Sequence, residues 1–427
     1  DWCISRQRAF GVPFPLWYCT ECGEALLADD DQLPIDPVEQ QPARACHCGG
    51  TSFTPEEDVM DTWATSSMSP QIVGRWLTDP ELYEQVFPMS LRTQAHEIIR
   101  TWAFDTIVKS YHHFGTLPWK NAAISGWGLA GEGMGKISKS RGGGPMPPLA
   151  MMEKYSADAV RYWAASTGPG KDAIISEEKI LLGGKLITKL WNVAKFAERF
   201  LEDYTPPREA ERLPAFTPTD RWLLSRAQQL IQRATAHFQH YDYAAAKSEI
   251  ESFFWRDLAD NYLEFAKERL YDTAHPLREG ARYTLFTTLL ATLKLFAPFF
   301  PFVTEEIYLA LFATSDGHES IHTSAWPSTE TDLINEEAEA DGELLIEIAT
   351  GVRRYKSEAN LSLGAPLTAL WLTTTEPGIA EMLNAAKVDL KSVTRATRIE
   401  VSEQFSESIG EWKMIKSVGS VSVSLAS

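Results

Sequence analysis

The secondary structure that the sequence favours changes at about Pro148, and this change constrains the fold more than any other feature. Before it, strand and helix signals alternate: helical spacing runs over 97–111, a short strand is expected over 122–125, and a glycine-rich loop covers 126–144. After it, strand signals fade and amphipathic helices follow one another to about Ser328. The predicted fold class is therefore multidomain, with an α/β part followed by an all-α part.

A chain of 427 residues is too long for one hydrophobic core. We expect an α/β domain over 1–148, a helical region over 149–207, an antiparallel helical bundle over 208–328 and a small α+β domain over 329–427. Thr219 is expected to cap the first helix of the bundle. Helices are expected at 148–155, 158–165, 181–204, 219–240, 243–271, 276–297, 304–312 and 342–359, and later strands at 366–373, 393–401 and 418–425.

The formal net charge is -18, with 58 acidic and 40 basic residues, which argues against a nucleic-acid partner steered by bulk charge. Local basic strips can still bind RNA in an acidic protein, so the net charge does not exclude an RNA partner and the local sequence has to be considered. The most apolar stretch, 285–303, is interrupted by Lys294, Pro298 and Pro301, and predicts a bundle helix that ends before Pro298 rather than a membrane span. Residues 1–30 show no secretory signal, so we expect a cytoplasmic protein without membrane partners.

Four of the five cysteines form two closely spaced pairs, Cys19 with Cys22 and Cys46 with Cys48. Two short loops that each present two soft ligands satisfy a tetrahedral metal ion, so we predict a structural Zn²⁺ in a zinc-ribbon insertion over about 17–55. Only one residue separates the second pair, and His47 is an alternative ligand there. The remaining alternative is a set of free thiols, because disulfides are rare in the cytoplasm.

Two lysines three residues apart lie in a segment rich in glycine and serine, Gly131 to Gly144. A mobile loop of this kind brings ammonium groups to a polyphosphate, where they stabilise the charge that builds on a departing pyrophosphate. Lys136 and Lys139, with Ser138 between them, are therefore the candidate catalytic residues. The alternative is a solvated basic turn.

The segment Lys136–Ser140 (KISKS) resembles the KMSKS signature of class I aminoacyl-tRNA synthetases, with Ile137 in place of methionine. Further segments look like class Ia segments in the expected order, and the DxxDTWxxSS form in particular resembles valyl-tRNA synthetases. These segments are 1–7 (DWCISRQ), 58–67, 154–161, 220–226, 253–255, 262–267 and 353–358.

The resemblance implies an assignment for each domain. Residues 1–148 would be the second half of a Rossmann-type catalytic domain, 149–207 a stem-contact region, 208–328 an anticodon-binding bundle and 329–427 a terminal domain. The implied reaction activates valine with ATP and its Mg²⁺ and transfers the valine to tRNA(Val).

The resemblance also implies that Trp63, Ile98 and Trp102 line the valine pocket. Ile98 and Trp102 are four residues apart on an expected helix and so share a face, which supports this assignment. The alternative is that both pack in the core.

For ATP, the resemblance implies that Glu97 accepts hydrogen bonds from the ribose hydroxyls and that the backbone at Gly126 and Trp127 approaches the adenine. The local pattern Ala95-His96-Glu97 departs from the Gly-x-Asp of bacterial valyl enzymes, and this leaves the Glu97 assignment open. A tight turn at Gly126 is compatible with either interpretation.

No HIGH-like segment is present in the sequence, and the editing domain of the family would precede Asp1. Since the chain opens inside a polar and aromatic stretch, we interpret its start as a cut within a larger protein and expect it to be inactive without an N-terminal half. Two alternatives stay open: an isoleucyl-tRNA synthetase fragment, and an inactive relative that only binds tRNA.

Several basic and aromatic residues after Pro148 are candidate RNA contacts by charge or stacking. Core positions or a solvated basic face are the alternatives. The candidates are Arg221, Trp222, Arg226, Trp255, Arg353, Arg354 and Lys356.

Overall fold

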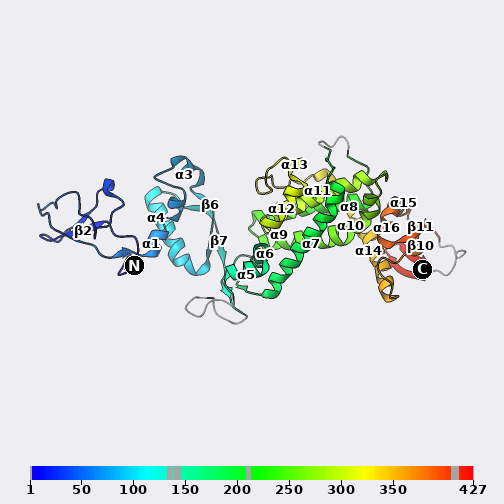
Figure 1. Cartoon of the computed structure of the whole chain (residues 1–427), viewed down its shortest axis with the longest axis horizontal. Coiled ribbons are helices and arrows are strands. Elements are labelled where there is room, and N and C mark those ends of the chain that lie inside the picture. The colour runs from blue at the N-terminus through cyan, green and yellow to red at the C-terminus, as the bar shows by residue number, and fades with distance from the viewer. Residues whose placement is uncertain (1, 132–136, 138–145, 208–212, 405–412, 427) are drawn as a thin grey trace. The chain divides into compact units, whose positions relative to one another are not determined.

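The computed structural model describes residues 2–131, 137, 146–207, 213–404 and 413–426. The chain forms two compact units (Figure 1): one contains 1–127 and 169–172, and the other contains 128–168 and 173–427. None of the described helices combines the length and the apolar character needed to cross a membrane.

The first unit begins with small antiparallel sheets. Strand β1 (Ser5–Arg6) pairs with β5 (Val59–Met60), and β2 (Leu16–Cys19) lies between β3 (Ala25–Leu27) and β4 (Phe53–Pro55). Trp17 on β2 is fully buried, and its indole N–H donates to the carbonyls of Pro37 and Gln40 at 3.1 and 3.0 Å. The connection from β3 to β4 therefore folds over this indole.

The rest of the first unit is an α/β arrangement around two parallel strands, β6 (Met89–Ala95) and β7 (Trp119–Ser125). Between these strands the chain runs through a 3-10 turn η2 (His96–Ile98), a π-helical turn η3 (Ile99–Ala103) and α4 (Phe104–Phe114). Gly115 ends α4 with a φ of 68°, a conformation that glycine adopts without strain. Three short helices precede β6: α1 (Thr62–Ser66), α2 (Ser69–Val73) and α3 (Pro80–Val86).

Helices dominate the second unit after a short parallel pair, β8 (Gly128–Leu129) with β9 (Ala173–Ile174). Their apolar faces share one large core, in which Trp222, Tyr262 and Phe296 are fully buried. The helices are α5 (Pro148–Tyr155), α6 (Ala157–Ala164), α7 (Glu177–Leu201), α8 (Pro218–Gln239), α9 (Tyr243–Ser252), the π-helical η6 (Phe253–Tyr262), α10 (Leu263–Tyr271), α11 (Arg278–Phe296), α12 (Pro301–Leu311), α13 (Ala313–Asp316) and α14 (Glu336–Glu358).

The last part of the second unit is a four-stranded sheet in the order β11-β10-β13-β12, with its own core cluster against α14 and α16. Only β10 and β11 are parallel. The elements are β10 (Leu367–Thr373), α15 (Pro377–Ala385), α16 (Lys387–Thr394), β11 (Ala396–Ser402), β12 (Lys413–Val418) and β13 (Val421–Ala426).

Most of the expected elements are confirmed, among them the helix at 148–155 and the bundle helix that ends before Pro298. Four details were wrong. The cap of α8 is Thr217, which forms a capping box with Asp220, rather than Thr219. Residues 393 and 394 end α16 instead of starting a strand.

The other two differences concern helices. Helix α14 begins at Glu336 because Asn335 caps it and the acidic side chains of its first turn suit the positive end of the helix dipole. The helical stretch expected at 97–111 is not uniform, since 3-10 and π turns precede α4. The domain boundaries at 148, 207 and 328 stay predictions.

Candidate functional site

The carboxyl ends of β6 and β7 lie side by side in the first unit, with Ala95 in register with Ser125. The residues that follow them, His96 to Ile98 and Gly126 with Trp127, are therefore close together. In open α/β sheets ligands bind outside the carboxyl ends of neighbouring parallel strands. Glu97 is exposed at this edge, in the first turn after β6.

Gly126 lies against the segment Pro169–Asp172, which belongs to the same unit. A Cβ atom at Gly126 would lie 2.4 Å from the carbonyl oxygen of Lys171 and 2.5 Å from a carboxylate oxygen of Asp172, so only glycine fits. The Asp172 carboxylate accepts the backbone N–H of Trp127 at 2.7 Å. The turn after β7 is thus fixed by a carboxylate far along the chain.

The aromatic rings at this edge pack on each other. The ring centroids of His96 and Trp127 are 4.7 Å apart, and Nδ1 of His96 lies 3.3 Å from the carbonyl oxygen of Ser125. The buried indole nitrogen of Trp127 has no hydrogen-bond partner among the described residues. The edge therefore presents a half-buried aromatic surface.

Trp63 lies on α1 and Trp102 on η3, and these two elements are in contact. The indole N–H of Trp102 donates to the carbonyl of Ser66 at 2.9 Å, on the helix that begins beside Trp63. Ile98 lies one turn before Trp102 and, like both tryptophans, is half-buried. None of the three belongs to a buried core cluster of the described residues, and the pocket and core alternatives both stay open. The π-helical turn that carries Trp102 is a feature found often at functional sites.

Sequence reasoning missed three polar residues of this region, namely Arg92, Gln94 and Asp172. Arg92 is buried on β6, with its guanidinium 3.0 Å from the ring centroid of Trp102 and 4.7 Å from that of Trp119. Burial lowers the pKa of Arg92 to about 10. No apolar alternation marked β6 as a strand, because its inward positions hold Arg92 and Gln94.

The candidate lysine loop can be placed only in part. Lys136, Ser138 and Lys139 lie outside the described residues. Ile137 is described, and its backbone N–H donates to the carbonyl of Gly128 at 3.0 Å within the second unit.

The four predicted cysteine ligands come together. Their sulfur atoms all lie within 4.8 Å of one another, with Sγ of Cys19 3.7 Å from that of Cys48 and Sγ of Cys22 3.5 Å from that of Cys46. These separations are far above the roughly 2.05 Å of a disulfide. They match the roughly 3.8 Å edge of a sulfur tetrahedron with metal–sulfur bonds of about 2.3 Å. Although only one residue separates Cys46 from Cys48, the sulfur of Cys48 therefore belongs to this group of four.

Local backbone geometry explains why these thiols converge. Gly23 and Gly49 each follow a cysteine pair with φ values of 75° and 90°. Their N–H groups donate to the carbonyls of Cys19 and Cys46, both at 2.8 Å, which closes a turn over 19–23 and a shorter one over 46–49. The backbone N–H groups of Cys22 and Glu21 lower the pKa of Cys19 to about 7. His47 is exposed and pairs with Glu24. The ligand atoms of Cys22, Glu24, Cys46 and His47 also lie within 4.8 Å of one another, so His47 stays an alternative ligand.

Two of the candidate RNA contacts are buried and cannot reach RNA, so the alternative of a core position holds for Trp222 and neither alternative holds for Lys356. Trp222 is fully enclosed in the bundle core. Lys356 is 1% exposed, and its ammonium group donates to the carbonyls of Leu363, Ala365 and Thr394 at 3.0, 2.6 and 2.9 Å. Its role is to close the turn after α14, because a buried ammonium needs several acceptors.

The remaining candidates keep some exposure. Trp255 and Arg353 are partly exposed, whereas Arg221 and Arg354 are exposed. Arg226 pairs with Asp257 at 3.4 Å.

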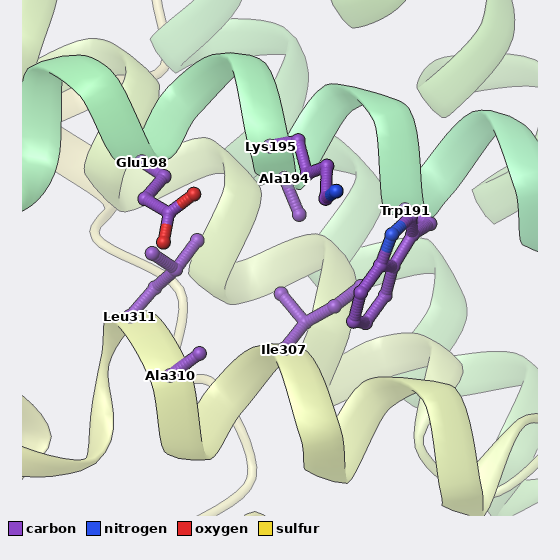
Figure 2. Close-up of a pocket in the computed structure, with 7 residues that line it drawn as sticks. All are labelled: Trp191, Ala194, Lys195, Glu198, Ile307, Ala310 and Leu311. Carbon is purple, nitrogen blue, oxygen red and sulfur yellow. The ribbon is translucent and has the colours of Figure 1, made fainter.

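A small pocket between α7 and α12 is a poor candidate for a ligand site. It holds about 90 Å³, too little for a nucleotide, and its walls are mostly apolar. Figure 2 shows its lining residues: Trp191, Ala194, Lys195, Glu198, Ile307, Ala310 and Leu311.

Two family profiles match the chain. Residues 1–176 match the profile described as tRNA synthetases class I (I, L, M and V), and residues 220–370 match the anticodon-binding domain of tRNA ligase. Together they take in both of the units described above.

Curated relatives extend this similarity over almost the whole chain. It is 43% identical over 408 residues to the valine–tRNA ligase of Methanopyrus kandleri, a match that covers 94% of this chain and 43% of that protein. It is 41% identical over 425 residues to the valine–tRNA ligase of Orientia tsutsugamushi, covering 95% of this chain and 49% of that protein. The chain thus spans less than half the length of these relatives.

A solved structure shares the fold. The LeuRS of Agrobacterium radiobacter K84, solved as a ternary complex with tRNA and LeuAMS, is 20% identical, with a TM-score of 0.61. The match covers 78% of this chain and 43% of that chain. The mixed α/β and helical architecture is therefore that of a class I synthetase.

Proposed function

Because the chain belongs to the valine–tRNA ligase family of class I tRNA synthetases, we propose that it is part of an enzyme that activates valine with ATP and transfers it to tRNA(Val). The observation that carries this proposal is the identity of about 40% to valine–tRNA ligases along nearly the full chain. The geometry at the ends of β6 and β7 supports it.

In this proposal the edge formed by β6 and β7 holds the adenosine of ATP. The missing side chain at Gly126 lets the segment Pro169–Asp172 pack against the turn, and the Asp172 carboxylate keeps that turn in place. The backbone of this turn would approach the base. Glu97 would accept hydrogen bonds from the ribose hydroxyls, since an ionised carboxylate offers only acceptors. Trp127 would cover one side of the nucleotide.

Valine would bind between Trp63, Ile98 and Trp102. The indole N–H of Trp102 is already satisfied by Ser66, so the ring offers valine an apolar surface. Dispersion and burial against such walls discriminate weakly against similar small side chains, by about 1–3 kcal/mol per methylene.

Adenylate formation breaks the bond between the α- and β-phosphates, and the leaving pyrophosphate gains charge. Lys136 and Lys139, with Ser138 beside them, would stabilise that charge together with the Mg²⁺ that accompanies ATP. Removing one such contact is expected to cost about 3 kcal/mol in the transition state, or roughly a hundredfold in rate.

The cysteine cluster fits a structural Zn²⁺, because four thiolates at tetrahedral separations match its preferred donor set. When bound, the ion would tie the turns at Cys19–Cys22 and Cys46–Cys48 together. It would take no part in the reaction, since a closed set of four sulfurs leaves no open position for substrate.

We expect the complete activity to need a part of the enzyme that this chain does not span. Helix α4 supports this expectation, because Phe104, Ile107, Val108 and Tyr111 form one apolar face that is exposed. An N-terminal half of the nucleotide fold would cover that face.

The test is amino-acid-dependent exchange of pyrophosphate into ATP, measured for this chain alone and for a longer polypeptide that restores the preceding segment. We expect no exchange by the chain alone and exchange with valine in preference to isoleucine by the longer protein. Preference for isoleucine would overturn the valine assignment. Good tRNA binding without exchange in the longer protein would indicate an inactive relative.

A further inference from the structure

A cleft of about 500 Å³ opens in the second unit, where helices of the bundle meet the terminal α/β domain. Its size lies within the range of small-ligand sites. It is walled by α7, the junction of η6 and α10, the end of α14 and the turn after α16. The residues that matter are Lys189, Asp260, Glu264, Arg353, Gly364 and Arg395.

One wall is the end of the π-helical segment η6. Arg353 on α14 donates to the side-chain oxygen of Asn261 at 3.0 Å and to the backbone carbonyl of Asp260 at 3.2 Å. Both acceptors belong to η6, so these two bonds hold the Arg353 guanidinium at the cleft. A π segment is a common feature of binding sites. Burial lowers the pKa of Arg353, but a guanidinium stays charged in proteins.

The cleft carries more positive than negative charge in a chain whose net charge is -18. Three cations face two carboxylates, and Lys189 pairs with Asp260 at 3.0 Å. Arg395 forms no ion pair within the described part of the chain, and its backbone has a φ of 59° at the end of α16. This position usually belongs to glycine, so a free arginine here needs a reason.

This mixture of groups matches one nucleotide of an RNA strand. Guanidinium and ammonium groups bind the phosphate, while carboxylates accept hydrogen bonds from a ribose 2′-hydroxyl or a base amino group. We infer that the cleft around Lys189, Arg353 and Arg395 binds a nucleotide of a single-stranded part of the tRNA. The inference rests on the proposed function and adds a specific contact site to it.

Gly364 permits a sharp test. A Cβ atom at this position would meet nothing within 4 Å, so a side chain can be added at the mouth of the cleft without a clash. Gly364→Glu adds a negative charge there, and Gly364→Gln adds nearly the same volume without charge. Arg395→Gln removes the free cation. Arg398→Gln, on the exposed part of β11, is the matched control for loss of charge.

The experiment measures binding of the full chain to a tRNA(Val) transcript by fluorescence anisotropy over a series of salt concentrations. We expect Arg395→Gln and Gly364→Glu each to weaken binding about three- to tenfold. The slope of log K against log salt should fall by about 0.7–1 for Arg395→Gln, the value for one phosphate contact. Gly364→Gln and Arg398→Gln should change neither quantity by more than about twofold.

The outcomes separate this inference from the proposed function. If the unaltered chain binds the transcript and Arg395→Gln and Gly364→Glu bind equally well with an unchanged slope, the cleft is not the contact site although tRNA binding stands. If Gly364→Gln weakens binding as much as Gly364→Glu, bulk rather than charge is responsible and the phosphate assignment fails. If the unaltered chain does not bind the transcript, the inference about the cleft fails, whereas the proposed function is decided separately by pyrophosphate exchange in the longer protein. Thermal melting of each variant checks that it is folded.

Discussion

Arg269 lies at the centre of a fully buried ion cluster, and replacing it with methionine should destabilise the second unit strongly. Its guanidinium donates to Asp220 at 2.8 and 3.0 Å and to Asp389 at 2.7 and 3.4 Å, and the three side chains are 0% exposed. The hydroxyl of Tyr262 also donates to Asp220, at 2.7 Å. The cluster links α8, α10 and α16 and so joins the bundle to the terminal domain.

The size of the effect follows from the charges left behind. Breaking a buried ion pair by removing one partner costs about 3–5 kcal/mol. Arg269→Met leaves two carboxylates without a counter-charge, so we expect the upper end, about 5 kcal/mol. Asp389→Asn leaves one carboxylate with one guanidinium and keeps an acceptor for Thr219, so we expect a smaller loss of about 1–2 kcal/mol.

The effect should also depend on pH. Burial raises the pKa of Asp389, which the Arg269 charge opposes. A carboxyl with a raised pKa holds its proton in the folded state after the unfolded chain has lost it, so its contribution to stability falls as pH rises through that window. Without Arg269 the pKa rises further. The defect of Arg269→Met should therefore be largest at about pH 7.5 and smaller at about pH 5.

The assay is urea unfolding followed by tryptophan fluorescence, with unfolding midpoints compared because a chain of several domains need not unfold in two states. Arg354→Met, which removes an exposed arginine paired with Glu358, is the control and should leave the midpoint unchanged. Two results would refute the reasoning: Asp389→Asn lowering the midpoint as much as Arg269→Met, or an Arg269→Met defect that is the same at both pH values.

Three further predictions concern other sites. Cys46→Ser should abolish the binding of about one Zn²⁺ per chain, measured by atomic absorption, and an unchanged metal content would exclude the cysteine cluster as the site. Arg92→Met should leave the urea midpoint of the first unit unchanged or raise it, because two of its buried nitrogens have no partner in the described part of the chain; a loss above about 2 kcal/mol would contradict this. Gly342→Ala should lower the free energy of unfolding by about 1–3 kcal/mol, since its methyl group would lie 2.0 Å from the ring of Trp222. Gly184→Ala on α7 meets no atom within 4 Å and should raise that free energy by about 1 kcal/mol. Equal urea midpoints for these two variants would show that α8 and α14 are less closely packed than the structure has them.

The sequence by itself determined the features that depend on local pattern. Apolar spacing and helix caps are properties of neighbouring residues, and so the helix at 148–155 was predicted to the residue and the bundle helices closely. The cysteine ligands were found for the same reason, because each pair belongs to one short turn. The KISKS segment and the family resemblance are likewise linear patterns.

Only the tertiary structure decided what depends on residues distant in sequence. It showed that Asp172 holds the turn at Gly126, that Lys356 is buried and not available to RNA, and that Arg395 faces a cleft with Lys189. A carboxylate or an ammonium has the same chemistry wherever it stands in the sequence, but its burial and its partners arise from packing between distant segments. For this reason the sequence named the candidate groups, and the fold decided which of them are free to bind a ligand.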